Sequence, residues 1–598
     1  DTHNPPNDFL DILSSNQFLP QILLPARITI SSKTLIDNIF TNKITHDNIS
    51  GNISASISDH LPQFSIIPDI FSNAPFPKSN IFERVWSNFD QHNFILDFFS
   101  IDWKQTLNLE EKGVNESFQS FLDRMNCLLD KYVPYKKVSK YKMKLKNKPW
   151  LSKGLQKSIQ IKNIIFKKYI KAKDDLTKNR FYENYKKYRN LLSTLMKKSK
   201  ENYYNHFFQS NLKNIRNIWK GIKSIISNSA TDLFVPQSIY SNGTLTSDSK
   251  GIANAFNDYF CNVAKDIQSS IRFSFKSFQD YLKNIFHKTF FISPTDSIEI
   301  SDIISHLSSG KSHGPNGIPT KILHLLKNDI SNILADLFNK SFAVGIFPSA
   351  LKIAKIIPIH KKDSKLECGN YRPISILSNL DKILEKLMYK RIYSFFETNN
   401  IIYDLQFGFR KNYSTNLALL SLTESINQQV DNGKYGCGIF IDFQKAFDTV
   451  DHNILLSKLC HYGVRGKAND WFKSYLSDRK QFVSINGFNS DLKNISCGVP
   501  QGSVLGPLLF LIYINDLYSS IKFCKVHHFA DDTNLLHFTD SIKNLNKTIN
   551  YDLKQLVHWL NANKIALNVS KTELVFFKPK KKKNDYDLNI NLAGYFFF

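Results

Sequence analysis

The pattern of hydrophobic and polar positions divides the chain into segments with different periods. Residues 1–75 carry short strand-like apolar runs, and the Pro- and Asn-containing stretch 72–80 predicts a linker. Over 85–230 apolar residues recur at three- and four-residue spacing, which predicts helices. A Ser-, Asn- and Gly-rich stretch indicates that 231–294 is a linker and helical connection. Helical and strand-like patterns then mix over 295–590, so we expect an α+β multidomain chain.

Two adjacent carboxylates, Asp531 and Asp532, lie between two short apolar runs that are rich in strand-forming residues. This pattern predicts a β-hairpin with both acids at its tip. A third carboxylate, Asp442, ends another apolar run, and it converges on the same spot if the strands are neighbours in one sheet. Adjacent acids repel unless a cation lies between them. Oxygen-only ligands suit Mg²⁺ or Mn²⁺, and a pair of such ions is the usual machinery of nucleotidyl transfer.

The charge of the chain points to a polyanionic partner. The 598 residues include 78 Lys and Arg against 52 Asp and Glu, a net charge of +26, which favours nucleic acid. The segment Lys136–Lys200 alone holds 22 basic and 3 acidic residues. Aromatic residues are interleaved with these charges, namely Tyr135, Tyr141, Trp150, Phe166, Phe181 and Tyr182. Two interpretations of this basic segment are open. It is either the solvated face of a helical hairpin or a surface that binds nucleic acid, and the scarcity of acidic residues favours nucleic-acid binding.

Cysteine usage and hydropathy exclude some classes of protein. The seven cysteines are scattered without a Cys-x-x-Cys pair, which argues against a zinc ribbon and fits reduced thiols inside a cell. No apolar run reaches the roughly 18 residues of a membrane-spanning helix, and no signal peptide opens the chain. We therefore expect no membrane partner.

Several further motifs follow one another along 295–590. They are a Gly- and Pro-rich loop at 310–319, a strand-like run ending in positive charge at 351–362, Asn-Tyr-Arg-Pro-Ile-Ser at 370–375, Gln-Phe-Gly-Phe-Arg at 406–410, an Asp-led segment at 442–452, Gly-Val-Pro-Gln-Gly-Ser at 498–503 and Leu-Asn-Val-Ser-Lys at 567–571. Each motif is weak alone, and an isolated Asp-Asp pair is usually a solvated turn. The ordered set resembles the fingers and palm of reverse transcriptases, and closely those of non-LTR (LINE-type) retrotransposons of the jockey group.

The resemblance implies a catalytic centre in an antiparallel palm sheet of a right-hand polymerase. Asp442, Asp531 and Asp532 would form the catalytic triad and the metal site for two Mg²⁺ ions, with Mn²⁺ as a possible substitute. Lys571 resembles the lysine that protonates the leaving pyrophosphate. Phe447, five residues after Asp442, matches a steric gate that excludes a ribose 2′-hydroxyl, with core packing as the alternative.

The resemblance also implies a nucleotide-binding set. Arg372 resembles the fingers arginine that grips the triphosphate, and Lys355 is a candidate partner. Gln501 and Gly502 would pack near the incoming nucleotide and the template strand. The remaining polar residues close to Asp442 in sequence, Asp448 and the Asp451-His452 pair, are interpreted as structural.

The two ends of the chain suggest further assignments. Residues 1–75 resemble the C-terminal fragment of an apurinic-endonuclease-like domain, a two-sheet α/β sandwich. There Ser58-Asp59-His60 matches the terminal catalytic motif. His60 would be the general acid/base, Asp37 would orient it, and Asp59 would stay near the metal or the phosphate. We expect the front half of this domain to be missing, so that nicking is absent. Residues 591–598 are expected to be a truncated end that lacks the thumb.

The leading functional hypothesis is RNA-directed DNA synthesis by target-primed reverse transcription. Its partners would be an RNA template, a DNA primer or target, and deoxynucleoside triphosphates, and its location intracellular, in the nucleus with a cytoplasmic ribonucleoprotein stage. A group II intron maturase or telomerase is an alternative, against which the Ser-Asp-His segment argues. A non-catalytic RNA-binding remnant is the alternative from a different class, against which the intact acids argue.

Overall fold

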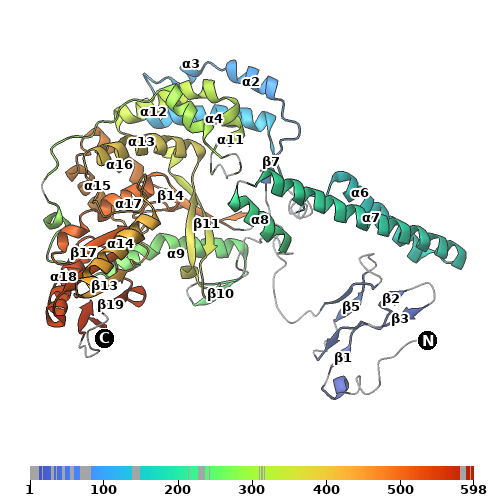
Figure 1. The fold of residues 1–598 in the computed structure, drawn as a ribbon. Helices are drawn as coiled ribbons and strands as arrows, with labels where there is room; N and C mark the ends of the chain where they lie inside the picture. The colour runs from blue at the N-terminus through green and yellow to red at the C-terminus, as the bar shows by residue number, and fades with distance from the viewer. Residues whose placement is uncertain are drawn as a thin grey trace. The chain divides into compact units, whose positions relative to one another are not determined.

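The computed structural model describes residues 12–16, 18–28, 32–35, 37–42, 48–53, 60–66, 82–137, 148–212, 214–226, 236, 238–241, 243–283, 285–308, 310, 314–315, 317–485, 487–579, 588–592 and 594–597. The chain forms two compact units. The smaller unit comprises Asp1–Ser79 and Val138–Phe234, and the larger unit comprises Asn80–Lys137 and Val235–Phe598. Residues 138–234 therefore interrupt the larger unit in sequence (Figure 1).

The first segment of the larger unit begins with β7 (Phe82–Arg84), which pairs antiparallel with β8 (Tyr135–Lys137). Between them lie α2 (Gln91–Phe99), α3 (Trp103–Leu107) and α4 (Val114–Tyr132). The apolar face of α4 packs on α12 (Lys327–Val344), with the Phe118 and Phe338 rings stacked at 6.4 Å. The predicted helical region 85–230 is thus divided between the two units. The apolar face of α4 is part of the core of the larger unit, whereas the basic helices belong to the smaller unit.

The central sheet of the larger unit has four antiparallel strands in the order β17-β18-β13-β19. The strands are β13 (Tyr435–Ile441), β17 (Lys525–Phe529), β18 (Asp532–Thr539) and β19 (Glu573–Phe577). The antiparallel palm sheet expected from the sequence is therefore present, and the mixture of helices and sheets confirms the α+β class. Helix α18 (Ile542–Ala562) packs on β18 and β13.

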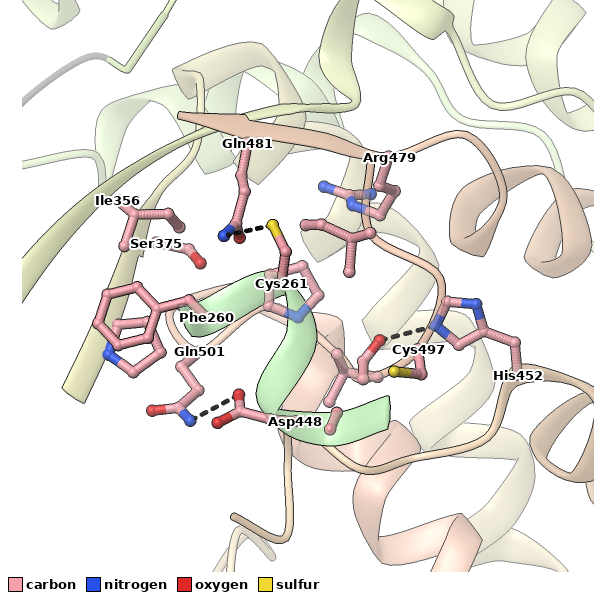
Figure 2. Close-up of a pocket in the computed structure, with 16 residues that line it drawn as sticks. Phe260, Cys261, Ile356, Ser375, Asp448, His452, Arg479, Gln481, Cys497 and Gln501 are labelled. Carbon is pink, nitrogen blue, oxygen red and sulfur yellow. Dashed lines mark hydrogen bonds between the residues drawn. The ribbon is translucent and has the colours of Figure 1, made fainter. Parts of the chain in front are cut away.

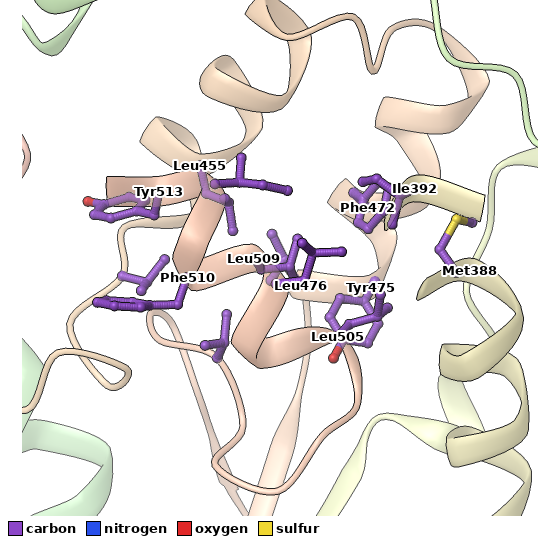
Figure 3. Packing of buried hydrophobic residues seen from close by; sticks show 14 of the residues in the cluster. Met388, Ile392, Leu455, Phe472, Tyr475, Leu476, Leu505, Leu509, Phe510 and Tyr513 are labelled. Carbon is purple, nitrogen blue, oxygen red and sulfur yellow. The ribbon is translucent and has the colours of Figure 1, made fainter. Parts of the chain in front are cut away.

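Helix α17 (Leu505–Ile514) is buried all round, which explains its continuous apolar sequence. It packs against α13 (Asn379–Thr398) and α15 (His452–His461), while α16 (Lys467–Leu476) contacts α15 and α12. Figure 3 shows side chains of α13, α15, α16 and α17 meeting in this core, including Met388, Leu455, Tyr475 and Phe510.

A second sheet has the strand order β12-β11-β14-β15, with β16 also paired to β14. Its strands are β11 (Ile353–His360), β12 (Tyr371–Ile376), β14 (Lys480–Ile485), β15 (Phe488–Asn489) and β16 (Lys493–Asn494). Helix α9 (Ser249–Ser270) covers this sheet, with the Phe256 ring 4.8 Å from that of Tyr371. The segment predicted as a linker and helical connection thus contributes a core helix, preceded by the short hairpin of β9 (Ile239–Ser241) and β10 (Thr244–Thr246).

The remaining helices and strands of the larger unit complete its outline. Helices α10 (Ser297–Ser305) and α11 (Thr320–Leu325) pack near α12, and α14 (Thr415–Asp431) contacts β13 and β17. Helix α11 begins where the Gly- and Pro-rich loop ends, although 309, 311–313 and 316 lie outside the described residues. The expected truncated end forms an antiparallel hairpin of β20 (Ile590–Leu592) and β21 (Tyr595–Phe597), and β20 contacts α18.

The smaller unit contains the basic helices α6 (Lys153–Lys171), α7 (Asp175–Ser210) and α8 (Ile215–Ile226). Helices α6 and α7 form a hairpin closed by the buried rings of Phe166, Tyr169 and Tyr185. The N-terminal segment forms two-stranded pairs: β1 (Leu19–Pro20) with β4 (Phe40–Thr41), β2 (Arg27–Ile28) with β3 (Lys33–Thr34), and β5 (Ile49–Asn52) with β6 (Gln63–Ile66). Among the described residues, no helix is both long and apolar enough to span a membrane.

Two adjacent histidines of β17, His527 and His528, are buried in the central sheet, each with 2% of its surface exposed. His528 shares a hydrogen bond of 2.9 Å between Nδ1 and the Thr533 hydroxyl. Burial disfavours the charged imidazolium, so the pKa of His527 is lowered to about 4 and that of His528 to about 3. The unfolded chain restores a pKa of about 6.5.

These lowered pKa values predict acid sensitivity. Because each folded pKa lies below the unfolded one, the neutral rings contribute their full stability above pH ~6.5, and this is lost as the pH falls towards the folded values. Between pH ~6 and ~4, the unfolding free energy should fall more steeply in the parent than in a His527→Gln/His528→Gln variant, by about 1.4 kcal/mol per pH unit for each histidine. Urea unfolding followed by tryptophan fluorescence measures both slopes, and equal slopes would contradict the prediction.

Candidate active site

The register of the central sheet brings three carboxylates to one end. Ile441, the last residue of β13, pairs with Thr533 of β18. Since the strands are antiparallel, Asp442 follows at the level of Asp532. Phe529 pairs with Asp532, so Ala530 and Asp531 form the two-residue turn between β17 and β18. The predicted hairpin is present, although only Asp531 is in the turn and Asp532 begins the second strand.

The three carboxylates repel each other. Burial is the main cause that raises the pKa of Asp531, and the charge of Asp442 raises it further. Burial also raises the pKa of the more exposed Asp532, followed by the charges of Asp531 and Asp442. A site in which one carboxylate raises the pKa of its neighbours favours an added cation.

The donor chemistry of this end of the sheet fits a hard divalent cation, because carboxylate oxygens are the ligands that Mg²⁺ prefers. Asp442 already engages neighbouring donors: its Oδ2 accepts from Asn568 Nδ2 at 2.6 Å and lies 3.4 Å from Lys571 Nζ. Among the described residues, no three His, Cys, Asp or Glu side chains are grouped closely enough to hold a metal ion as they stand.

Basic side chains surround the carboxylates. Arg372 is exposed on β12, and its charge, with that of Lys361, lowers the pKa of Asp531. Lys361 directly follows β11, and its own pKa is lowered, first by burial and then by the charges of Lys571 and Arg372. Arg372 and Lys361 therefore both act on the carboxylate end of the central sheet.

Lys355 and Lys361 differ in their distance from Arg372 along the sheet. Arg372 pairs with Ile359, whereas Lys355 pairs with Ile376. Lys355 thus lies four residues further along β11, about 14 Å at ~3.4 Å per residue. Sequence reasoning missed Lys361, and the signal that could have found it was its place in the Lys361-Lys362 pair directly after the strand.

Gln501 and Gly502 pack against β12. The Gln501 carbonyl accepts from the Ser375 amide at 2.8 Å. Gly502 has a φ of +125°, and a Cβ there would lie 2.5 Å from the Ser375 carbonyl oxygen, so a side chain is excluded on both grounds. The Gln501 side chain donates from Nε2 to Asp448 Oδ1 at 2.9 Å.

Asp448, interpreted as structural from the sequence, is the residue that holds the Gln501 amide. Burial raises its pKa to about 6. The two side chains line a cavity of about 50 Å³, together with residues such as Cys261, His452 and Cys497 (Figure 2). This cavity has room for little more than water, so it is a packing feature beside the site.

Phe447 is half-buried between two other rings. Its ring stacks on Phe510 of α17 with centroids 4.6 Å apart and meets the Phe409 ring edge-on at 6.3 Å. Phe409 is 49% exposed and has a positive φ of 56°, a conformation that bulky residues rarely adopt. Packing on one side and exposure on the other leave both the core interpretation and the gate interpretation of Phe447 open.

The Gln-Phe-Gly-Phe-Arg segment supports the turn that carries Asp531. Gln406 Oε1 accepts from the Gly408 amide at 2.8 Å and from the Ala530 amide at 3.0 Å. The Phe407 amide donates to the His528 carbonyl at 2.8 Å, which adds this segment to the edge of the sheet. A Cβ at Gly408 would collide with the Ala530 backbone. The sequence identified this motif but did not show that it contacts the turn of Ala530 and Asp531.

The N-terminal segment brings together two of its predicted residues. His60 Nδ1 and Asp37 Oδ2 form a short hydrogen bond, and the Asp37 carbonyl accepts from Gln63 Nε2 at 2.6 Å. Asp59 lies outside the described residues, as does Tyr141 of the basic region.

The geometry defines a class of protein. An antiparallel sheet with three carboxylates at one end, next to a hairpin that carries basic side chains, fits the palm and fingers of a nucleotidyl-transferring polymerase. Residues 359–588 match the family model of reverse transcriptase (RNA-dependent DNA polymerase). Over this segment the match confirms the resemblance that the motifs predicted.

Relatives from mobile elements extend the similarity to about half of the chain. The chain is 31% identical over 315 residues to the RNA-directed DNA polymerase from mobile element jockey of Drosophila melanogaster, covering 50% of this chain and 33% of that protein. It is 31% identical over 344 residues to the probable RNA-directed DNA polymerase from transposon BS, and 29% identical over 353 residues to that from transposon X-element, both of the same organism. These two matches cover 55% and 57% of this chain, and 37% and 38% of the relatives. The chain thus spans little more than a third of their length.

The contact between Gly408 and Ala530 predicts the result of a single substitution. Gly408→Ala should lower the unfolding free energy by about 1–3 kcal/mol, because the added methyl group must displace the turn or the segment that supports it. Hydrogen exchange should show the loss of protection in β17 and β18. Gly113→Ala is the matched control, since a Cβ at Gly113 meets no atom within 4 Å. Equal stability of the two variants would contradict the packing described for the turn.

Proposed function

We propose that this chain is the polymerase part of a non-LTR retrotransposon enzyme that copies an RNA template into DNA from a DNA primer by target-primed reverse transcription. The observation that carries the proposal is the β13–β18 register, which brings Asp442, Asp531 and Asp532 to one end of the sheet. The names of the relatives, RNA-directed DNA polymerases from mobile elements, support it.

Asp442 and Asp531 would hold two Mg²⁺ ions, and Asp532 would support the position of the primer end. When bound, such ions lower the pKa of an attacking hydroxyl and stabilise charge on a leaving group. The protein's part is to place the primer 3′-hydroxyl and the α-phosphate in line. The backbone contributes to this placement through the rigid turn that Gln406 and Gly408 support.

The basic side chains have separate proposed tasks. Arg372 and Lys361 would bind the triphosphate, since both lie at the same end of the β11–β12 hairpin and both lower the pKa of Asp531. Lys571, 3.4 Å from Asp442, would hold the proton that passes to the leaving pyrophosphate. Gln501 and Gly502 would line the path of the nucleotide and template. Lys355, which lies further from Arg372 than Lys361 does, is proposed as a more distant partner of Arg372 in binding the triphosphate.

Phe447 is proposed as the sugar gate. Its ring is held by Phe510 on one side, so it cannot retreat into the core when a ribose 2′-hydroxyl approaches. A ring fixed in this way discriminates by contact rather than by hydrogen bonding.

The basic helices and the N-terminal segment are assigned to nucleic-acid handling. Helices α6 and α7 are proposed to bind the RNA or DNA backbone, on the strength of the charge of Lys136–Lys200. His60 and Asp37 are proposed as an acid/base pair of an endonuclease-like domain, and their hydrogen bond supports this. A non-catalytic RNA-binding role remains the second candidate, and primer extension separates the two.

The triad assignment predicts the effect of removing one carboxylate. Asp531→Asn should lower primer extension on an RNA template by several orders of magnitude while RNA affinity stays nearly unchanged, because a metal ligand is lost and the turn is kept. Asp540→Asn, at the opposite end of β18, is the matched control and should retain activity. Comparable extension by the parent and Asp531→Asn would refute the assignment of the palm.

The gate assignment predicts a change in sugar discrimination. Phe447→Val should lower the preference for deoxynucleotides over ribonucleotides by about tenfold or more, since the 2′-hydroxyl gains space. Phe447→Tyr keeps the ring and should keep the preference. The ratio of kcat/KM for the two sugars measures this effect. If Phe447→Val discriminates like the parent, the ring only packs against Phe510.

A further inference from the structure

A groove runs along one side of the α6–α7 hairpin, beside its aromatic seam. We call it the hairpin groove. It has a volume of about 420 Å³ and is lined by Ile165, Lys168, Phe181, Asn184, Lys187, Tyr188 and Leu191. Positions 181, 184, 188 and 191 follow the three- and four-residue spacing of one helix face, so α7 presents them together. The buried seam consists of Phe166, Tyr169 and Tyr185, and the groove residues Ile165 and Phe181 pack against it.

The groove combines an apolar floor with a polar rim. Phe181 and Tyr188 are half-buried, whereas Lys168, Asn184 and Lys187 are exposed. Leu191 leaves 61% of its surface in water. No ion pair within the described part of the chain involves Lys168 or Lys187. Rings and uncompensated ammonium groups therefore border the same open space.

This combination selects among possible ligands. An acidic peptide would satisfy the two lysines, but it offers a flat ring to Phe181 and Tyr188 only where an aromatic residue adjoins its carboxylates. A duplex presents phosphates but keeps its bases stacked inside. A single strand presents both, because each base has a π-face and each nucleotide carries one phosphate. The groove is within the size range of small-ligand pockets, which begins at about 300 Å³.

We propose that the hairpin groove binds a nucleotide of a single-stranded nucleic acid, with its base against Tyr188 and Phe181. Lys168 and Lys187 contact the flanking phosphates, and Asn184 offers its amide to the base edge. The inference rests on the proposed nucleic-acid binding of the basic helices and specifies its site. RNA and DNA single strands share this chemistry, and the 2′-hydroxyl is the feature that can distinguish them.

The test measures binding of the full chain to labelled oligouridylate, oligothymidylate and a duplex by fluorescence anisotropy over a range of salt. Tyr188→Ala should weaken single-strand binding by about 5- to 150-fold, the equivalent of ~1–3 kcal/mol per stacked base. The loss should persist at high salt, because stacking releases no counterions. Tyr188→Phe keeps the ring and should bind like the parent. Tyr203→Ala removes a ring of α7 outside the groove and should also bind like the parent.

A second variant keeps the inference testable if Tyr188→Ala disturbs the hairpin. Lys187→Glu changes an exposed side chain and should weaken single-strand binding more than Lys198→Glu, the same charge change on an exposed residue of α7 outside the groove. Equal effects of the two reversals, or parent-like binding by both Tyr188→Ala and Lys187→Glu, would overturn the proposal. Preference for RNA over DNA, or the reverse, identifies the strand bound.

Primer extension on a pre-annealed template separates this inference from the proposed polymerase. If the parent extends primers and binds single strands, but the groove variants bind like the parent, the groove assignment fails alone. If extension is absent while the groove variants lose binding, the polymerase proposal fails and the groove assignment stands.

Discussion

The antiparallel pairing of β13 with β18 is the constraint on which the rest of the site depends. Because Ile441 is opposite Thr533, the residue that follows β13 and the turn that precedes β18 are at the same level. A shift of this register by one residue would turn every side chain of one strand to the opposite face, and Asp442 would leave the other two acids. Burial of alternating side chains such as Ile439 and Leu535 on the core side opposes such a shift.

This pairing brings three carboxylates to one place, where their negative charges repel one another. The surrounding residues determine how this repulsion is offset and how the turn is held in place. The charge of Asp442 raises the pKa of Asp531 and of Asp532, while the charges of Arg372 and Lys361 lower the pKa of Asp531. The turn cannot relax away from Asp442, because Gln406 holds the Ala530 amide and Gly408 lies directly against it. Gly502 brings the Gln501 segment into similar contact with Ser375 of β12, which joins the sheet of β12, β11 and β14 to the core helices. Two glycines thus set the close approaches that position the candidate site.

Residues 138–234, which interrupt the larger unit in sequence, differ from that unit in how much apolar surface they bury and how much charge they expose. The larger unit buries an extensive apolar core, in which α4 and α9 take part although both precede the residues matched by the reverse transcriptase family. The inserted helices have a small aromatic seam and many lysines, so charge rather than burial dominates their exposed surface. A segment of this kind is suited to contact a polyanion without being required for the packing of the sheet that carries the acids.

The sequence by itself determined the local features: the acidic hairpin, the strand that ends just before Asp442, the order of the motifs and the basic helical stretch. These depend on alternation, spacing and turn chemistry, which are properties of neighbouring residues. The tertiary structure alone decided which strands are neighbours, that Lys361 lies nearer than Lys355 to Arg372, that Asp448 holds Gln501, and that 80–137 packs with the larger unit. A hydrophobic face specifies that it must be covered but not by what, and that partner is set by contacts between residues hundreds of positions apart.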